Sequence, residues 1–283
     1  MAVTPFSGAG VDERSFAELA AWQVDAGSSG LCVAGPAGEA PTLTGRERER
    51  LIAIARESAG GRAVIIAGLC TSSTEAGIAL ARSAAAAGTD ALLVQAPPYS
   101  RPAQEGICRH IEAIARATDC AVLVQNDPGR TRVELAPSSV ERLSRLDRVV
   151  GFVDACRAAA WPPPARGKLG FTARDEQAAS FLLAGGSGIL SVAANVVPGL
   201  CAALHRACRE GRGGEAMRLQ HRLLPLVDAI GPDGDPAPVK YALFLLRSGV
   251  SPDLRLPLVR CCAERARRIA EALEILKEEV SWA

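Results

Sequence analysis

Short apolar runs alternate along this chain with longer segments in which apolar residues recur at helical spacing. Residues Val149 to Val153 form such a run, with charged residues before it and small residues after it. A strand covered on both faces needs no polar alternation, so this run predicts a buried strand. Apolar residues from Phe16 to Val24 instead recur at helical spacing after Asp12, which can cap a helix.

The same alternation predicts eight strands, each but the last separated from the next by a helix or a short crossover. The expected strands are residues 1–6, 29–34, 63–68, 90–95, 120–125, 149–153, 168–171 and 188–192. The expected helices are residues 12–27, 44–60, 73–88, 104–118, 137–145, 175–184 and 198–209, followed by 215–230, 238–248 and 256–279. Residues 155–164 should form only a brief crossover, because Pro162, Pro163 and Pro164 cannot continue a helix. The first strand starts so abruptly that we expect it to be the weakest, with several of its residues absent.

Eight alternating units favour an α/β protein, a (β/α)₈ barrel, with residues 1–211 as the barrel and 212–283 as a C-terminal helical appendix. A chain of 283 residues with 48 % apolar content is long enough for one such core. A doubly wound open sheet is the alternative fold. It would call for a G-x-G-x-x-G loop after its first strand, and the sequence contains none.

Composition narrows the possible partners. The net charge of +1 favours neither nucleic acid nor a membrane surface, so we expect a small-molecule ligand. The nine cysteines include no C-x-x-C pair, and we expect most to be buried thiols in a reducing cytoplasm. The three histidines, His110, His205 and His221, all fall on expected helices, so no metal centre is predicted. We expect no other cofactor and no membrane segment.

The loop after the fourth expected strand carries a longer motif, Ala96-Pro97-Pro98-Tyr99-Ser100-Arg101-Pro102-Ala103-Gln104-Glu105-Gly106. It resembles the P-Y-Y-x-R-P-x-Q-E-G segment of the dihydrodipicolinate synthase and N-acetylneuraminate lyase family, the pyruvate-dependent class I aldolases. The other matching segments, in the family's order, are Val3 to Phe6, Gly35 to Glu39 (G-T-T-G-E in the family), Asn126 to Thr131 (within Y-N-x-P-x-R-T), Gly188 to Val196 (G-x-I-S-V-x-A-N) and Pro236 to Lys240. The resemblance covers nearly the whole chain and implies a barrel.

The same resemblance implies that the reactive groups of the family are missing here. The position of the family lysine, which condenses with pyruvate to an imine, is occupied by Val153. Gln125 stands where the family has a proton-relaying tyrosine. Pro36 and Ala37 replace the two threonines of G-T-T-G-E, and Pro36 also lacks a backbone N–H.

Other family positions are retained. Tyr99 matches a tyrosine that a neighbouring subunit contributes to the relay, and Arg130 matches an arginine that meets a substrate carboxylate. Gly35, Ala37 and Ser191 are the other positions expected to contact a small carboxylate or keto acid. The resemblance also implies a homotetramer or dimer, and a mixed oligomer with an active paralogue is a further option.

Three functions remain open from the sequence. The first is a binding or assembly protein that has lost imine chemistry. The second is a lyase or aldolase-type enzyme that acts on a keto acid or sugar acid without an imine, through the carboxylates Glu39, Asp127, Asp154 and Asp175, although such residues also cap helices. The third is an imine-forming lyase that uses a relocated lysine, for which only Lys168, Lys240 and Lys277 are available.

Overall fold

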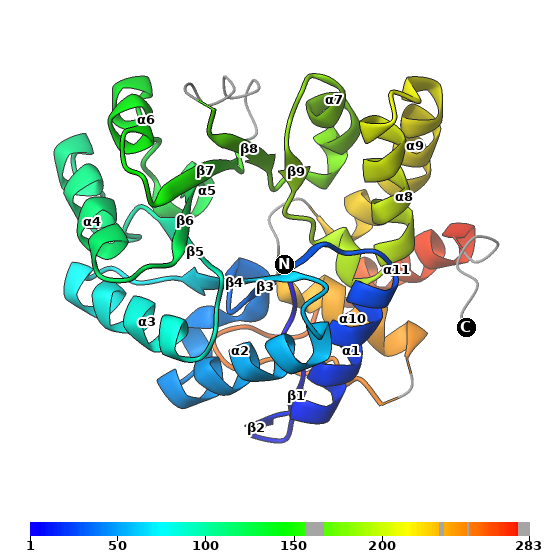
Figure 1. Ribbon diagram of the computed structural model, residues 1–283. Helices are drawn as coiled ribbons and strands as arrows, with labels where there is room; N and C mark the ends of the chain where they lie inside the picture. Colours follow the sequence, from blue (N-terminus) through cyan, green and yellow to red (C-terminus); the bar gives the residue numbers. More distant parts are fainter. Residues whose placement is uncertain (157–166, 232–234, 248, 277–283) are drawn as a thin grey trace.

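The computed structural model describes residues 1–156, 167–231, 235–247 and 249–276. Seven parallel strands form one curled sheet in the order β3-β4-β5-β6-β7-β8-β9, with helices on its outer side (Figure 1). The strands are β3 (Gly30–Val33), β4 (Val64–Leu69), β5 (Ala91–Gln95), β6 (Ala121–Asn126), β7 (Val149–Asp154), β8 (Leu169–Thr172) and β9 (Gly188–Ile189). This confirms an α/β fold with a parallel sheet. It excludes the doubly wound fold, in which the order of the strands reverses partway across the sheet.

The expectation of eight strands is corrected at the N-terminus. Residues 1–5 have no assigned strand, and the next residues form a separate antiparallel pair, β1 (Phe6–Ser7) and β2 (Gly10–Val11). In the described residues no strand pairing joins β3 to β9, so the curled sheet is open between them. Residues 1–6 are mostly apolar, as a buried strand would be, but a strand also needs a neighbouring strand along its length. In the described part of the chain, only residues 1–3 of this segment hydrogen-bond to residues at or near the edges of β3 and β9.

Several helices begin directly after a residue whose side chain caps them. Asp12 accepts a hydrogen bond from the Ser15 N–H at the start of α1 (Glu13–Asp25), and Thr44 forms a capping box with Glu47 at the start of α2 (Gly45–Ala59). The other helices are α3 (Thr74–Ala86), α4 (Gln104–Arg116), α5 (Pro128–Thr131), α6 (Pro137–Ser144), α7 (Ala178–Leu183), α8 (Pro198–Arg209), α9 (Gly213–Ile230), α10 (Pro236–Leu246) and α11 (Ala263–Leu276). None of the helices in the described ranges is both long and apolar enough to span a membrane.

Two details differ from the sequence prediction. The last helix begins at Ala263 and not at Leu256. The four-residue helix α5 was not predicted, although Asp127 caps it and Pro128 opens it. The predicted brief crossover at 155–164 lies almost wholly outside the described residues.

The apolar core has three parts. One lies between the first strands and helices α1 to α4, and a second joins α7 to α11. The third lies inside the curled sheet and consists of Cys32, Leu93, Leu123, Val153, Ala173 and Leu190. This inner cluster separates a small cavity at the strand ends from a larger one at the strand starts, because Leu93 lines the former and Leu123 the latter.

One ion pair ties the C-terminal region to the start of the chain. Arg255 donates to both carboxylate oxygens of Glu47, at 2.5 and 2.9 Å, and its guanidinium lies 4.5 Å from the centre of the Phe6 ring. The pair is only about a fifth exposed, and the bond from Arg255 lowers the pKa of Glu47 to about 2. Because the folded-state pKa is depressed, the stabilisation is complete above the ordinary value of 4.5 and is lost as the pH falls toward 2.

We therefore expect Glu47→Gln to lower the free energy of unfolding at pH 7 by roughly 1–3 kcal/mol. The difference from the unaltered protein should shrink as the pH is lowered from about 5 to about 3. Urea unfolding at several pH values measures this. Glu57→Gln, at an exposed position of the same helix, is the matched control. A difference for Glu47→Gln that stays constant over this range would show that Arg255 does not hold the carboxylate.

Candidate functional site

A small cavity lies where strands β3 to β6 end, the edge of the sheet at which the sequence places function. Its volume is about 60 Å³. Since one water needs about 10–15 Å³, the cavity has room for roughly four to six waters or for a three-carbon acid. The lining residues are Ala34, Gly35, Pro36, Ala40, Pro41, Gly68, Leu69, Cys70, Leu93, Gln95, Gln125 and Arg130.

Two buried amides from neighbouring strands face this cavity. Gln95 and Gln125 are opposite each other in the register of β5 and β6. Gln125 Nε2 donates to Asp127 Oδ2 at 3.3 Å, and Gln95 Nε2 contacts Cys70 Sγ at 3.5 Å. Gln95 Oε1 is buried and has no hydrogen-bond partner within the described parts of the chain. A buried amide with a free polar atom is suited to contact a polar ligand.

Arg130 is the charged residue of the cavity wall. It lies on α5, where Asp127 accepts a hydrogen bond from the Arg130 N–H at 3.3 Å. The Arg130 Nε lies 3.6 Å from Asp127 Oδ2, so the carboxylate also orients the guanidinium. The side chain stays partly exposed, which leaves the planar fork at the boundary between the cavity and solvent. This arrangement is suited to capture an entering carboxylate.

Cys70 is a further polar group of the wall. Burial raises the pKa of its thiol, while the guanidiniums of Arg48 and Arg130 and the contact with Gln95 act in the opposite direction. Since burial is the largest effect, the thiol should be neutral at physiological pH. Among the described residues, the cavity wall therefore combines the Arg130 cation with neutral hydrogen-bonding groups.

The loop after β3 closes one side of the cavity. Gly35 and Pro36 line it, whereas Ala37 is fully buried behind the loop. The loop can pass this close to β4 because Gly68 has no side chain: a Cβ there would lie 2.4 Å from the Ala34 carbonyl oxygen. Of the predicted contact positions, Gly35 and Arg130 thus meet at one cavity and Ala37 does not.

Val153 lies on β7 directly opposite Gln125 in the strand register. Its side chain is 0 % exposed and packs in the inner apolar cluster with Leu93 and Leu123. It is therefore one strand away from an amide of the cavity wall, and it offers only hydrocarbon to that side of the sheet.

The two described lysines are held elsewhere. Lys168 donates to the Leu146 carbonyl at 3.1 Å, before the start of β7. Lys240 Nζ lies 2.5 Å from Glu39 Oε1, and both side chains are 0 % exposed. It also donates to the Asp253 carbonyl at 2.8 Å. Neither lysine lines the small cavity. The third candidate, Lys277, lies outside the described residues.

The carboxylates that the sequence grouped together each have a partner within the chain. Glu39 pairs with Lys240, and Asp127 caps α5. Asp154 accepts from the Cys156 N–H at 3.1 Å. Asp175 accepts from the Val192 and Ala193 N–H groups at 2.9 Å each, and burial raises its pKa. Of the four, Asp127 is bonded to residues of the cavity wall.

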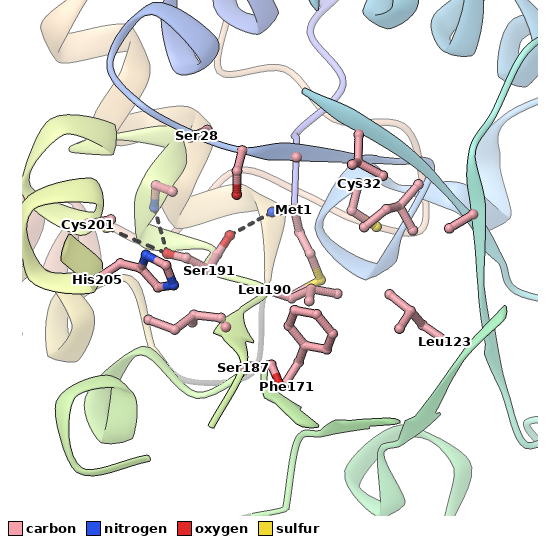
Figure 2. A pocket seen from close by; sticks show the side chains of 18 of the residues that line it. Met1, Ser28, Cys32, Leu123, Phe171, Ser187, Leu190, Ser191, Cys201 and His205 are labelled. Carbon is pink, nitrogen blue, oxygen red and sulfur yellow. Dashed lines mark hydrogen bonds between the residues drawn. The ribbon is translucent and has the colours of Figure 1, made fainter. Parts of the chain in front are cut away.

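Tyr99 and Ser191 are placed away from the small cavity. Tyr99 is 97 % exposed and has a positive φ of 74°, so its loop projects from the surface. Ser191 lines the larger cavity, where its hydroxyl accepts from the Ala194 N–H at 2.9 Å (Figure 2).

Comparison with known proteins decides the relationship that the motifs suggested. The model of the dihydrodipicolinate synthetase family matches residues 1–276. The chain belongs to this family. A 4-hydroxy-tetrahydrodipicolinate synthase of Gluconacetobacter diazotrophicus is 38 % identical over 279 residues, covering 96 % of this chain and 93 % of that protein. One from Zymomonas mobilis is 40 % identical over 263 residues, covering 91 % and 90 % of the two chains.

Solved structures of the family show the same fold. The chloride-inhibited dihydrodipicolinate synthase of Acinetobacter baumannii, solved in complex with pyruvate, superposes with a TM-score of 0.92 at 30 % identity. The alignment covers 97 % of this chain and 96 % of that one. The fold of this family member is therefore that of the synthase structures.

Two residues of the cavity wall, Cys70 and Gln95, were missed in the sequence. Gln95 ends the apolar run of the fourth expected strand, and Cys70 directly follows Leu69, the last residue of β4. A polar residue at the carboxyl end of a parallel strand was the available signal. Because we expect most of the nine cysteines to be buried thiols, the sequence does not single out Cys70 as a residue of the site.

Proposed function

We propose that this family member binds a small keto acid or a similar small carboxylate in the cavity at the ends of β3 to β6, and that it does so without forming a pyruvate imine. The observation that carries this is the burial of Val153 in hydrocarbon beside the cavity, at the position where the resemblance to the family expects the reactive lysine. An imine needs an amine at this point, and a branched hydrocarbon cannot supply one.

The remaining wall suits recognition without covalent attachment. Arg130 supplies a permanent charge for a carboxylate, and the amides of Gln95 and Gln125 can hydrogen-bond a keto oxygen. An enzyme with altered, non-imine chemistry is the weaker alternative, because the carboxylates it would use are occupied as described above. A turnover that is lost on substitution of Asp127 would favour that alternative.

Arg130→Ala should abolish the thermal stabilisation that a small keto acid gives. At a pyruvate concentration ten times its Kd, the unaltered protein should gain about 1.4 kcal/mol, which raises its Tm by roughly 3–5 °C. The variant should show no rise, because the carboxylate then enters a buried site without a cation to balance its charge. Differential scanning fluorimetry with a pyruvate titration measures both.

Two comparisons test whether the stabilisation requires the Arg130 guanidinium and the carboxylate of the ligand. Arg132→Ala, an exposed arginine two residues away, should keep the stabilisation. Acetone, which has the carbonyl without the carboxylate, should give none to any of the three proteins. If pyruvate and larger keto acids and sugar acids all leave the Tm of the unaltered protein unchanged, a small-carboxylate site is ruled out and an assembly role remains.

We also propose that the Tyr99 loop is a contact between subunits, in a homodimer or homotetramer or in a mixed oligomer with an active paralogue. Its support is the nearly complete exposure of a large aromatic side chain in a backbone conformation that non-glycine residues rarely adopt. Sedimentation of the unaltered chain tests self-association, and co-purification with the paralogue tests the mixed form. A monomer that retrieves no paralogue would contradict both.

A further inference from the structure

One polar atom of the small cavity is not used by the keto-acid binding proposed above. Gln95 is the last residue of β5, is 7 % exposed and lines the cavity at the ends of β3 to β6. Its Oε1 is buried and has no hydrogen-bond partner in the described parts of the chain. A buried acceptor without a donor costs free energy, so a ligand that brings a donor to this atom gains affinity.

The neighbours of Gln95 set the orientation of its amide. Gln95 Nε2 donates to Cys70 Sγ at 3.5 Å, so the nitrogen is turned toward the sulfur and the oxygen is left for a ligand. Gln125, which lies opposite in the strand register, has its Nε2 on Asp127 Oδ2 at 3.3 Å. Of the two amides in the cavity wall, Gln95 is the one with a buried acceptor that no described residue reaches.

The rest of the wall limits which ligand can supply the donor. Arg130 is the charged residue of the wall, and its guanidinium fits a carboxylate. The cavity of about 60 Å³ holds only a short acid. In so short an acid, the group beside the carboxylate is the one that can face Gln95 when the carboxylate meets Arg130. The chemistry of that group therefore decides whether Gln95 Oε1 becomes paired.

We infer that the ligand of this cavity is a small hydroxy acid, whose hydroxyl donates to Gln95 Oε1 while its carboxylate meets Arg130. This inference rests on the function proposed above and narrows its ligand class. A keto oxygen only accepts hydrogen bonds, so a keto acid of the same size would set two acceptors against each other or leave Gln95 Oε1 unpaired. A hydroxyl both donates and accepts, so it can pair with Gln95 Oε1 without losing its bond to a neighbouring N–H.

Three acids of the same length isolate this group: lactate carries the hydroxyl, pyruvate carries the carbonyl and propionate carries neither. Isothermal titration calorimetry on the unaltered chain should give the tighter enantiomer of lactate a Kd about tenfold or more below those of pyruvate and propionate. In Gln95→Met the three Kd values should lie within about threefold of one another, because the acceptor is gone while the volume is nearly kept. Gln125→Met is the matched control, which should bind all three acids more weakly and still prefer lactate.

The comparison of the three acids on the unaltered chain does not depend on any variant folding. Pyruvate or propionate binding as tightly as lactate would overturn the inference, because Gln95 Oε1 would then make no bond to a hydroxyl. A folded Gln95→Met protein that keeps the tenfold preference for lactate would also overturn it. In these results the acids still bind, so the proposed small-carboxylate site stands. If none of the three acids binds to the unaltered chain, both the proposed site and this inference are contradicted.

Discussion

Lys240→Met is expected to lower the free energy of unfolding by about 3–5 kcal/mol, since it leaves the carboxylate of Glu39 buried without its cation. Lys240 also bonds to the Asp253 carbonyl and lies 4.1 Å from the centre of the Phe6 ring, so α10, the loop after β3 and the start of the chain meet at one charge. Urea unfolding followed by circular dichroism measures the loss. The result also bears on function, because a lysine in this role is not available to attack a carbonyl.

The second described lysine provides the matched control. Lys168 makes one hydrogen bond at a partly exposed position, so Lys168→Met should cost roughly 1 kcal/mol or less. Adding Glu39→Gln to Lys240→Met should recover part of the stability, because the unpaired charge is then removed. A Lys240→Met protein as stable as the Lys168→Met protein would mean that the buried pair does not hold the C-terminal helices to the loop after β3.

Val153→Lys is expected to give the protein the capacity to form a pyruvate imine. A lysine at this position starts one strand away from Gln125 and has an arm long enough to reach the cavity wall. Burial lowers the pKa of such an amine, so a large share is free to attack the keto carbon at neutral pH. Incubation with pyruvate, reduction with borohydride and intact-mass measurement should show one adduct per chain. Overpacking should cost about 1–3 kcal/mol of stability.

Two additional variants locate the reaction. Arg130→Ala in the Val153→Lys background should require much more pyruvate for the same adduct, because the carboxylate is no longer oriented. Gln125→Tyr in that background places a tyrosine where the resemblance expects one that relays protons. This second change should speed adduct formation. A folded Val153→Lys protein that forms no adduct even at saturating pyruvate would show that the geometry of the cavity, and not only its chemical groups, is unsuited to forming an imine.

Most of the helices and the seven strands of the curled sheet were predictable because their signals are local. Asp12 and Thr44 bond to residues three positions ahead, so capping is visible in a few letters of sequence. Val149 to Val153 lies in a strand covered on both faces, and its unbroken run of apolar residues predicts such a buried strand. The start of the last helix was misplaced because apolar residues continue at helical spacing before Ala263, and such spacing alone does not fix the residue at which a helix begins.

Long-range pairing was not predictable in this way. Glu39 and Lys240 are far apart in the sequence, and nothing near either residue indicates that they meet in the core. From the sequence, Glu39 was grouped instead with Asp127, Asp154 and Asp175 as carboxylates that could carry out catalysis. The first strand failed for a related reason. Whether residues 1–6 pair as a strand depends on which segments lie beside them in the folded sheet, and their own apolar pattern does not reveal this. Arg130 and Gln125 were found because the motif Asn126 to Thr131 fixes the loop that carries one and the strand end that carries the other.

Trapping with pyruvate and borohydride on the unaltered chain tests the central claim most directly, with the Val153→Lys protein as the positive control. If Val153 occupies the position of the reactive amine and Lys240 and Lys168 are held elsewhere, the intact mass should be unchanged after reduction. A stoichiometric pyruvate adduct on the unaltered chain, mapped to any of its lysines, would contradict the account.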